Sequence, residues 1–213
     1  MKLISINIGK KRTLPKKDSV EVTGIFKIPV HDSVQITNLG FVDDFIGSKK
    51  HHGGPDQAVY LYGGADYAWW SAELGQELAP GTFGENLTIS ELRSAEFNIG
   101  DIISMGGVRL QVTAPRIPCG TFARRMEDSQ WVKKFRHAER PGLYCRVIQE
   151  GILQAGYDVS IERYTGETIS ILDNYRGYYE KDKSEEFIRR QLKAPIAIRA
   201  RVALEKELES LLK

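Results

Sequence analysis

The sequence predicts a mainly β protein with some α-helix, in which a β-barrel is followed by a small three-helix domain. Short segments of strand composition recur up to residue 163, and helical spacing replaces them from residue 164 onward. Twelve of the 20 glycines lie between Gly40 and Gly107, where turns should be tight. Because short strands with few helices do not alternate as βαβ units, the pattern favours a barrel. We therefore expect a barrel domain over residues 1–163 and a helical domain over residues 164–213.

Eight segments before residue 163 have the composition of β-strands. They are residues 2–8, 20–28, 33–37, 57–62, 86–90, 101–105, 108–113 and 143–149. The last of these alternates most clearly, since Leu143 and Cys145 should face one way while Tyr144 and Arg146 face the other.

Helices are expected in three places. Residues 64–77 have apolar side chains at helical spacing, and Asp66 is placed as an N-cap. Residues 119–138 contain two short helical runs with aromatic pairs four residues apart. Residues 164–213 contain three runs of helical period, with ten Lys and Arg against nine Asp and Glu, so this tail is not a basic arm. The alternative to a separate domain is a helical extension that lies on the barrel.

Composition excludes several classes of protein. The 30 Lys and Arg against 28 Asp and Glu give a net charge of +2, which does not favour nucleic-acid binding. No apolar run reaches the roughly 18–20 residues of a membrane span, and two cysteines make neither a disulfide framework nor a zinc clip. P-loop and dinucleotide fingerprints are absent. We expect a cytoplasmic protein that binds neither nucleic acid nor membrane.

Cys119 is the first candidate for chemistry. It follows a predicted strand and begins a helical run, with Arg116 nearby in the sequence. Cationic neighbours and a helix amino terminus lower the pKa of a thiol, and the thiolate is the form that ligates a soft metal or attacks an electrophile. A buried, inert thiol is the alternative, and it is the favoured interpretation for Cys145.

Two further motifs have polar side chains on glycine-rich turns. The first is a loop that contains Lys50, His52 and Gly53 and runs through Asp56 into a strand. Closely spaced glycines let backbone N–H groups approach an anion, although an ordinary solvated turn has the same composition. The second motif is Gly84-Glu85-Asn86 at a strand start, where Glu85 can anchor a turn, accept a proton or orient a ligand.

Taken in order along the chain, these motifs resemble the MOSC domain, the family of molybdenum-cofactor sulfurase carboxyl-terminal domains. The resemblance rests on the Lys-His-Gly-Gly loop that leads into Asp56, on Gly84-Glu85-Asn86, on Gly100-Asp101 and on the segment from Pro115 to Cys119. It extends over roughly residues 1–163, and the helical tail is similar to that of the YiiM-like branch.

The resemblance implies a barrel whose cleft binds a molybdenum cofactor (molybdopterin) and a reductase that acts on N-hydroxylated small molecules such as hydroxylaminopurine-type base analogues. Cys119 would then be the molybdenum ligand and a catalytic residue. Catalytic roles would also fall to His52, Asp56 and Glu85, the first two as proton relays. Cofactor contacts would come from Lys50, His52, Gly53, Gly84, Asn86 and Arg116. Because two cysteines are too few for an iron–sulfur cluster, the electrons would come from an external electron-transfer protein.

Two alternatives keep the barrel. One is a sulfur carrier that uses a Cys119 persulfide in cofactor or metal–sulfur assembly; it would depend on a partner for sulfur, because no pyridoxal-phosphate desulfurase module is present. The other is a non-catalytic cofactor-binding module whose tail docks onto a partner through Leu204, Leu208 and Leu211. A homodimer is a further expectation.

Overall fold

The computed structural model describes residues 1–48 and 52–212, and its centre is an eight-stranded mixed sheet. Its order is β13-β9-β10-β11-β7-β8-β1-β4, in which the β7–β8 pair is parallel and the other pairs are antiparallel. Its strands are β1 (Leu3–Gly9), β4 (Lys27–Val30), β7 (Val59–Gly63), β8 (Leu87–Ile89), β9 (Ile102–Met105), β10 (Val108–Pro115), β11 (Leu143–Gln149) and β13 (Ser160–Glu162).

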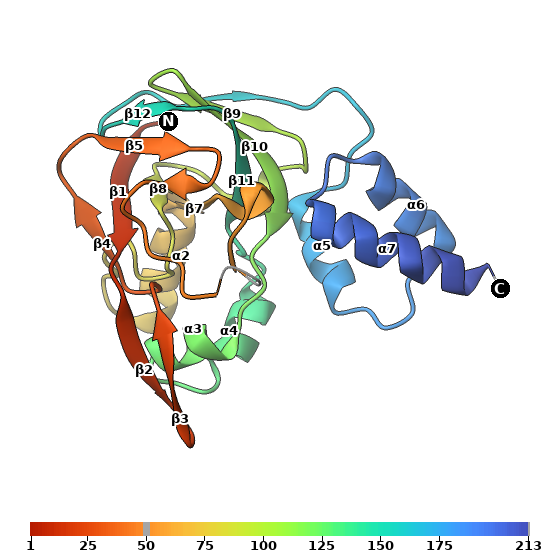
Figure 1. Cartoon of the computed structure of the whole chain (residues 1–213), viewed down its shortest axis with the longest axis horizontal. Coiled ribbons are helices and arrows are strands. Elements are labelled where there is room, and N and C mark those ends of the chain that lie inside the picture. The colour runs from red at the N-terminus through yellow and green to blue at the C-terminus, as the bar shows by residue number, and fades with distance from the viewer. Residues whose placement is uncertain (49–51, 213) are drawn as a thin grey trace.

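Two small sheets complete the β structure (Figure 1). One contains β12 (Gly151–Leu153), β5 (Val34–Thr37) and β6 (Gly40–Phe41). The other is a hairpin of β2 (Arg12–Lys16) and β3 (Ser19–Thr23), which projects from the body of the molecule. The predicted class, a sheet-dominated fold followed by helices, is confirmed.

The main core lies under the concave side of these strands and follows the predicted alternation. Leu143 and Cys145 are fully buried in it with the apolar side chains of β1, β9 and β10. Tyr144, on the other face of β11, packs into a separate aromatic cluster built around Trp70 and Phe83. Burial of apolar area on both faces of β11 holds the sheet between the two clusters.

Some strand predictions were wrong. The expected strand over residues 20–28 is two strands, β3 and β4, because Gly24 packs against the backbone carbonyl of Phe45 and the chain turns there. A Cβ at Gly24 would lie 1.7 Å from that carbonyl oxygen, so only glycine allows this approach. The strands β2, β6, β12 and β13 were not predicted, since they are short and lie at sheet edges.

Among the strands, the described residues form the α-helices α2 (Gly64–Leu74), α3 (Gly120–Arg125) and α4 (Trp131–Ala138). The predicted N-cap role of Asp66 was wrong, because the N-cap of α2 is Gly63 and Asp66 lies inside the helix. Asp66 is fully buried; it accepts hydrogen bonds from the backbone N–H and the hydroxyl of Ser94 and pairs with Arg140 at 2.9 Å. Its carboxylate thus serves a tertiary contact that no local pattern reveals.

The chain ends in α5 (Ile171–Tyr178), α6 (Glu185–Lys193) and α7 (Ile198–Leu211), which lie together at one side of the sheets (Figure 1). Ser170 and Ser184 cap the first two by accepting a backbone N–H three residues on. Buried Ile171, Ile188 and Leu204 join the main core cluster. The division into two domains at residue 163 stays a prediction.

No helix in the described ranges combines the length and the apolar composition that crossing a membrane would require.

Candidate functional site

A cleft opens between the base of the β2–β3 hairpin, the segment 44–48, the end of η1 (Pro55–Gln57), the loop before β8 and the loop after β10. It contains about 640 Å³ of space free of protein atoms, part of it open to solvent. Of the predicted site residues, His52, Gly84, Asn86, Arg116 and Cys119 line this cleft. Segments that are far apart in the sequence therefore meet at one cleft, as the resemblance to the MOSC domain implied.

Cys119 is partly buried at the cleft wall, directly before α3. Burial of the thiol opposes ionisation, but a hydrogen bond from His52, the guanidinium of Arg116 and the backbone N–H of Phe122 outweigh it and lower the pKa of Cys119 to about 6. The side chain is therefore mostly thiolate at neutral pH. Cys145 is its opposite, because burial raises the pKa of that thiol and the charge of Arg146 offsets this only in part.

Arg116 is the buried cation of the cleft, with 4% of its surface exposed. Its guanidinium donates to the carbonyl of Phe83 and lies 4.9 Å from the ring centres of Tyr60 and Phe122. Its Nε has no hydrogen-bond partner, and no carboxylate pairs with it among the described residues. A buried charge without a counter-ion is costly, so this arginine points to an anion in the cleft beyond the Cys119 thiolate.

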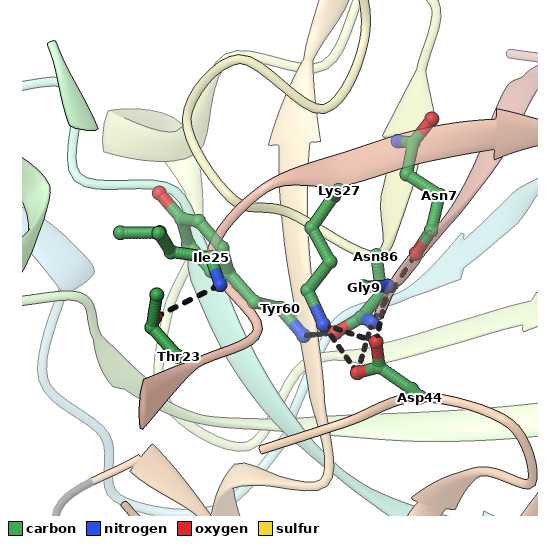
Figure 2. Close-up of polar contacts among 8 residues, drawn as sticks. All are labelled: Asn7, Gly9, Thr23, Ile25, Lys27, Asp44, Tyr60 and Asn86. Carbon is green, nitrogen blue, oxygen red and sulfur yellow. Dashed lines mark hydrogen bonds and ion pairs between the residues drawn. The ribbon is translucent and has the colours of Figure 1, made fainter. Parts of the chain in front are cut away.

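The cleft floor holds an ion pair that the sequence analysis missed (Figure 2). Lys27 and Asp44, both almost fully buried, pair directly, and burial lowers the pKa of Lys27 despite that partner. Asp44 also accepts from the backbone N–H of Gly9 at 2.7 Å and from Asn86 Nδ2 at 2.9 Å. Neither residue stands in a recognisable motif, so no sequence signal could have found the pair.

Asn86 connects this floor to the sheet. Its Oδ1 accepts from the backbone N–H of Tyr60 at 3.2 Å, and its Nδ2 donates to Asp44 and to the carbonyl of Asn7. The strands β1 and β7 and the cleft segment at Asp44 therefore meet at one amide side chain directly before β8 (Figure 2). The geometry makes Asn86 a positioning residue at the edge of the cleft.

Glu85 does not line the cleft, although we predicted a catalytic role for it. The side chain is fully buried, and its Oε1 accepts from the hydroxyl of Tyr67 at 2.6 Å, the backbone N–H of Gly81 at 2.6 Å and the hydroxyl of Thr88 at 2.9 Å. Burial raises the pKa of Glu85. These contacts give it a structural task, which is to hold the loop that presents Gly84.

The remaining predicted residues lie elsewhere. Asp56, predicted as a proton relay, points away from the cleft and contacts Arg146 and the start of α7. Gly53 does not line the cleft, whereas Gln57 and Ala58 do. Lys50 lies outside the described residues.

Gly84 brings backbone close to the buried arginine. Its φ is +75°, and a Cβ there would lie 3.0 Å from Ile25 Cγ1 and 3.3 Å from Arg116 Nη1. Glycine is thus favoured both by the left-handed backbone and by the limited space beside Arg116.

The donor set limits the kind of metal site that could form. Within the described ranges, no three His, Cys, Asp or Glu side chains gather in a way that could hold a metal ion. A single soft thiolate beside cationic groups suits a metal that arrives with an anionic organic ligand of its own.

Comparison with known proteins matches this arrangement to a family. The family model for the MOSC domain matches residues 48–160, which include every predicted site residue. The chain belongs to the MOSC domain family. A Bacillus subtilis (strain 168) relative described as uncharacterized protein YflK is 32% identical over 190 residues, which are 89% of this chain and 86% of that protein.

Two further comparisons narrow the part of the MOSC family to which this protein is similar. The crystal structure of YiiM from Geobacillus stearothermophilus superposes with a TM-score of 0.79 at 26% identity, covering 97% of this chain and 98% of that one. The match includes the C-terminal helices, so the chain is a YiiM-like MOSC protein. A Gibberella moniliformis protein named reductase is 32% identical over 146 residues, which are 66% of this chain and 26% of that larger protein.

Proposed function

We propose that this MOSC protein binds a molybdenum cofactor of the molybdopterin type in the Cys119 cleft and reduces N-hydroxylated small molecules there. The observation that carries the proposal is the pair formed by the Cys119 thiolate and the buried Arg116, which has no carboxylate partner among the described residues. Membership of the MOSC family and the reductase name of one relative support the same conclusion.

The residues of the cleft fit such a group in three ways. Cys119 offers one soft, ionised sulfur, which suits molybdenum better than a hard cation. The unpartnered Nε of Arg116 offers a charge-assisted donor to an anion such as a phosphate or a dithiolene sulfur. The absence of a side chain at Gly84 lets Arg116 lie close to the backbone there, which keeps this donor in the cleft.

The reaction would be R–NHOH + 2 H⁺ + 2 e⁻ → R–NH₂ + H₂O. When bound, the cofactor would supply a metal centre that passes two electrons to the substrate. The chain itself would hold that centre through Cys119, offset its negative charge through Arg116, and donate a proton to the departing hydroxyl. His52 is the side chain placed for that proton, because it lies in the cleft wall within hydrogen-bond reach of the thiolate.

The role of Lys27, Asp44 and Asn86 would be to hold the cleft in shape, without taking part in the reaction. Because the Lys27–Asp44 pair is already neutral as a unit, its task would be to keep the floor rigid while the charge of the ligand is met by Arg116. An Asp44→Asn variant should then loosen the floor and lower cofactor content, with a smaller effect on the rate per bound molybdenum.

The test is the molybdenum and pterin content per chain after expression in a host that makes the cofactor. Wild-type protein should hold near-stoichiometric metal and reduce 6-N-hydroxylaminopurine with a chemical electron donor, and Cys119→Ala should lose both. Cys145→Ala is the matched control, because it removes a thiol that is buried away from the cleft. A Cys119→Ala protein with full metal content and full activity would refute the proposal.

The same lowered pKa favours a second candidate, a sulfur carrier that uses a Cys119 persulfide, since a thiolate is also the attacking form in sulfur transfer. This candidate predicts cyanide-labile sulfur on the purified protein, its loss in Cys119→Ala, and transfer to an acceptor without bound molybdenum. Metal content and labile sulfur measured on one sample separate the two.

A further inference from the structure

The β2–β3 hairpin has a concentration of positive charge that the proposed chemistry does not use. Five of the eight residues 10–17 are Lys or Arg, and none is acidic. All five cations are exposed: Lys10, Lys11, Arg12, Lys16 and Lys17. The hairpin pairs with no other strand and projects from the body of the molecule (Figure 1). Arg12, Lys16 and Lys17 therefore face solvent on a protruding arm, with Lys10 and Lys11 directly before it and the exposed Asp18 at its turn.

None of these five cations takes part in an ion pair among the described residues. Of the thirteen ion pairs between described residues, only the Glu21–Arg124 pair involves the hairpin. Arg12 and Arg125 both stack on the ring of Phe26, at 5.2 and 4.8 Å, and so add a second cation from α3 to the same side. The patch made by these two arginines and the four hairpin lysines is strongly positive in a protein whose net charge is only +2.

The patch is joined to the segment that contains the thiolate. Glu21 on β3 accepts a hydrogen bond from the hydroxyl of Thr121 at 2.9 Å and pairs with Arg124, and Thr121 lies two residues after Cys119. The same strand lines the cleft with Glu21, Val22 and Thr23. A molecule seated at the base of the hairpin, where Arg12 pairs with Thr23, would therefore lie beside the Cys119 cleft.

We propose that the hairpin patch is the docking surface for an acidic electron-transfer protein. The inference rests on the proposed reductase function, which needs two electrons per substrate in a chain with too few cysteines for an iron–sulfur cluster and no dinucleotide fingerprint. Redox encounters use small interfaces and depend on electrostatic steering between oppositely charged surfaces. Unpaired lysines beside the cleft provide that steering.

The experiment compares two charge-reversed variants of equal net charge. The hairpin variant is Lys10→Glu, Lys11→Glu and Lys16→Glu. The control variant is Lys133→Glu, Lys181→Glu and Lys206→Glu, three exposed lysines on or near the helices that form no ion pair among the described residues. An acidic flavodoxin and an acidic [2Fe–2S] ferredoxin, each with its NADPH-dependent reductase, serve as electron donors, and reduced benzyl viologen serves as a small donor that needs no docking.

At low salt the hairpin variant should lose about 10-fold or more in kcat/KM for the better acidic carrier, and the loss should shrink as salt screens the charges. The control variant should stay within about twofold of wild type. With saturating viologen all three proteins should turn over alike. Equal losses in both variants, or an equal loss with viologen, would overturn the proposal. Unchanged kinetics with the carriers in the hairpin variant would also overturn the proposal. The lysines would then serve only to protect a strand edge from aggregation.

Direct binding separates this proposal from the reductase function itself. Titration of each carrier against cofactor-loaded protein measures affinity without turnover, and weaker binding by the hairpin variant alone supports the docking surface even if no N-hydroxylated substrate is reduced. If wild type binds neither carrier more tightly than the hairpin variant does, the docking surface is refuted. Preferential binding of single-stranded DNA, lost in the hairpin variant, would also overturn it and assign the patch to nucleic acid.

Discussion

The Asp56 carboxylate lies 3.0 Å from the Nε of Arg146 and accepts a 2.6 Å hydrogen bond from the backbone N–H of Ile198. The contact with Nε is ionic and lacks the alignment of a hydrogen bond. Arg146 also donates to the carbonyls of Pro195 and Ile196, at 3.1 and 3.0 Å. One carboxylate therefore ties β11 and the first residue of α7 to η1, whose last residue, Gln57, lines the cleft.

Asp56→Ala should lower the free energy of unfolding by about 2 kcal/mol, because it leaves the half-buried guanidinium of Arg146 without its counter-ion and the N–H of Ile198 without its acceptor. Asp56→Asn should cost less, since the amide oxygen can still accept from Ile198. Urea denaturation of both variants measures these costs. The rate per bound molybdenum should stay near wild type, whereas a loss of rate without a loss of stability would restore the predicted proton-relay role.

The control for that substitution is Asp158→Ala. Its carboxylate pairs with Lys2 at 2.8 Å, but the two side chains are 86% and 59% exposed. Exposed pairs contribute little because water screens them and ordering two long side chains costs entropy. The unfolding midpoint should therefore hardly change.

The rate at which iodoacetamide alkylates Cys119 should follow a titration with a midpoint near pH 6, because the thiolate is the reactive form and the pKa of Cys119 is lowered to about 6. His52→Ala should move the midpoint upward, since it removes a hydrogen bond to the thiolate. Cys145 should not react in the native state. A wild-type midpoint near 8.5, the value of a free cysteine, would contradict the electrostatic account of the cleft.

Glu85→Gln should be compared with wild type across pH. The pKa of Glu85 is raised in the folded state, so between its unfolded value and its folded value the native protein holds the extra proton, and wild-type stability falls as pH rises. The variant lacks this titration. Its stability relative to wild type should therefore increase as pH rises from about 4.5, as measured by urea midpoints at several pH values. The opposite trend would mean that the carboxylate is stabilised when ionised.

Gly84→Ala tests whether the space beside Arg116 matters, and Gly107→Ala is the matched control variant. Both glycines have positive φ, +75° and +85°, so each alanine should cost about 1 kcal/mol of backbone strain. A Cβ at Gly107 meets nothing within 4 Å, whereas one at Gly84 crowds Arg116. We expect reduced molybdenum content for Gly84→Ala alone. Equal metal content in the two variants would show that this space is not used.

Local sequence patterns predicted the strands and helices in which buried side chains recur at a regular spacing. The alternation at Leu143, Tyr144 and Cys145 appeared as two buried faces, because side-chain direction in a strand follows from sequence position alone. Asp66 shows where such reasoning fails. Its sequence position fits a cap, yet its partners, Ser94 and Arg140, are 28 and 74 residues away and become neighbours only after folding.

The sequence by itself determined the fold class, the family and the candidates Cys119 and Arg116, since these depend on composition, periodicity and short motifs. Only the tertiary structure decided which polar residues share the cleft. It brought Lys27 and Asp44 to the floor and His52 to the thiolate, and it assigned Glu85 and Asp56 to structural contacts. The physical reason is that the pKa and the accessibility of a side chain depend on groups distant in the chain, and their approach is set by how the strands and helices pack.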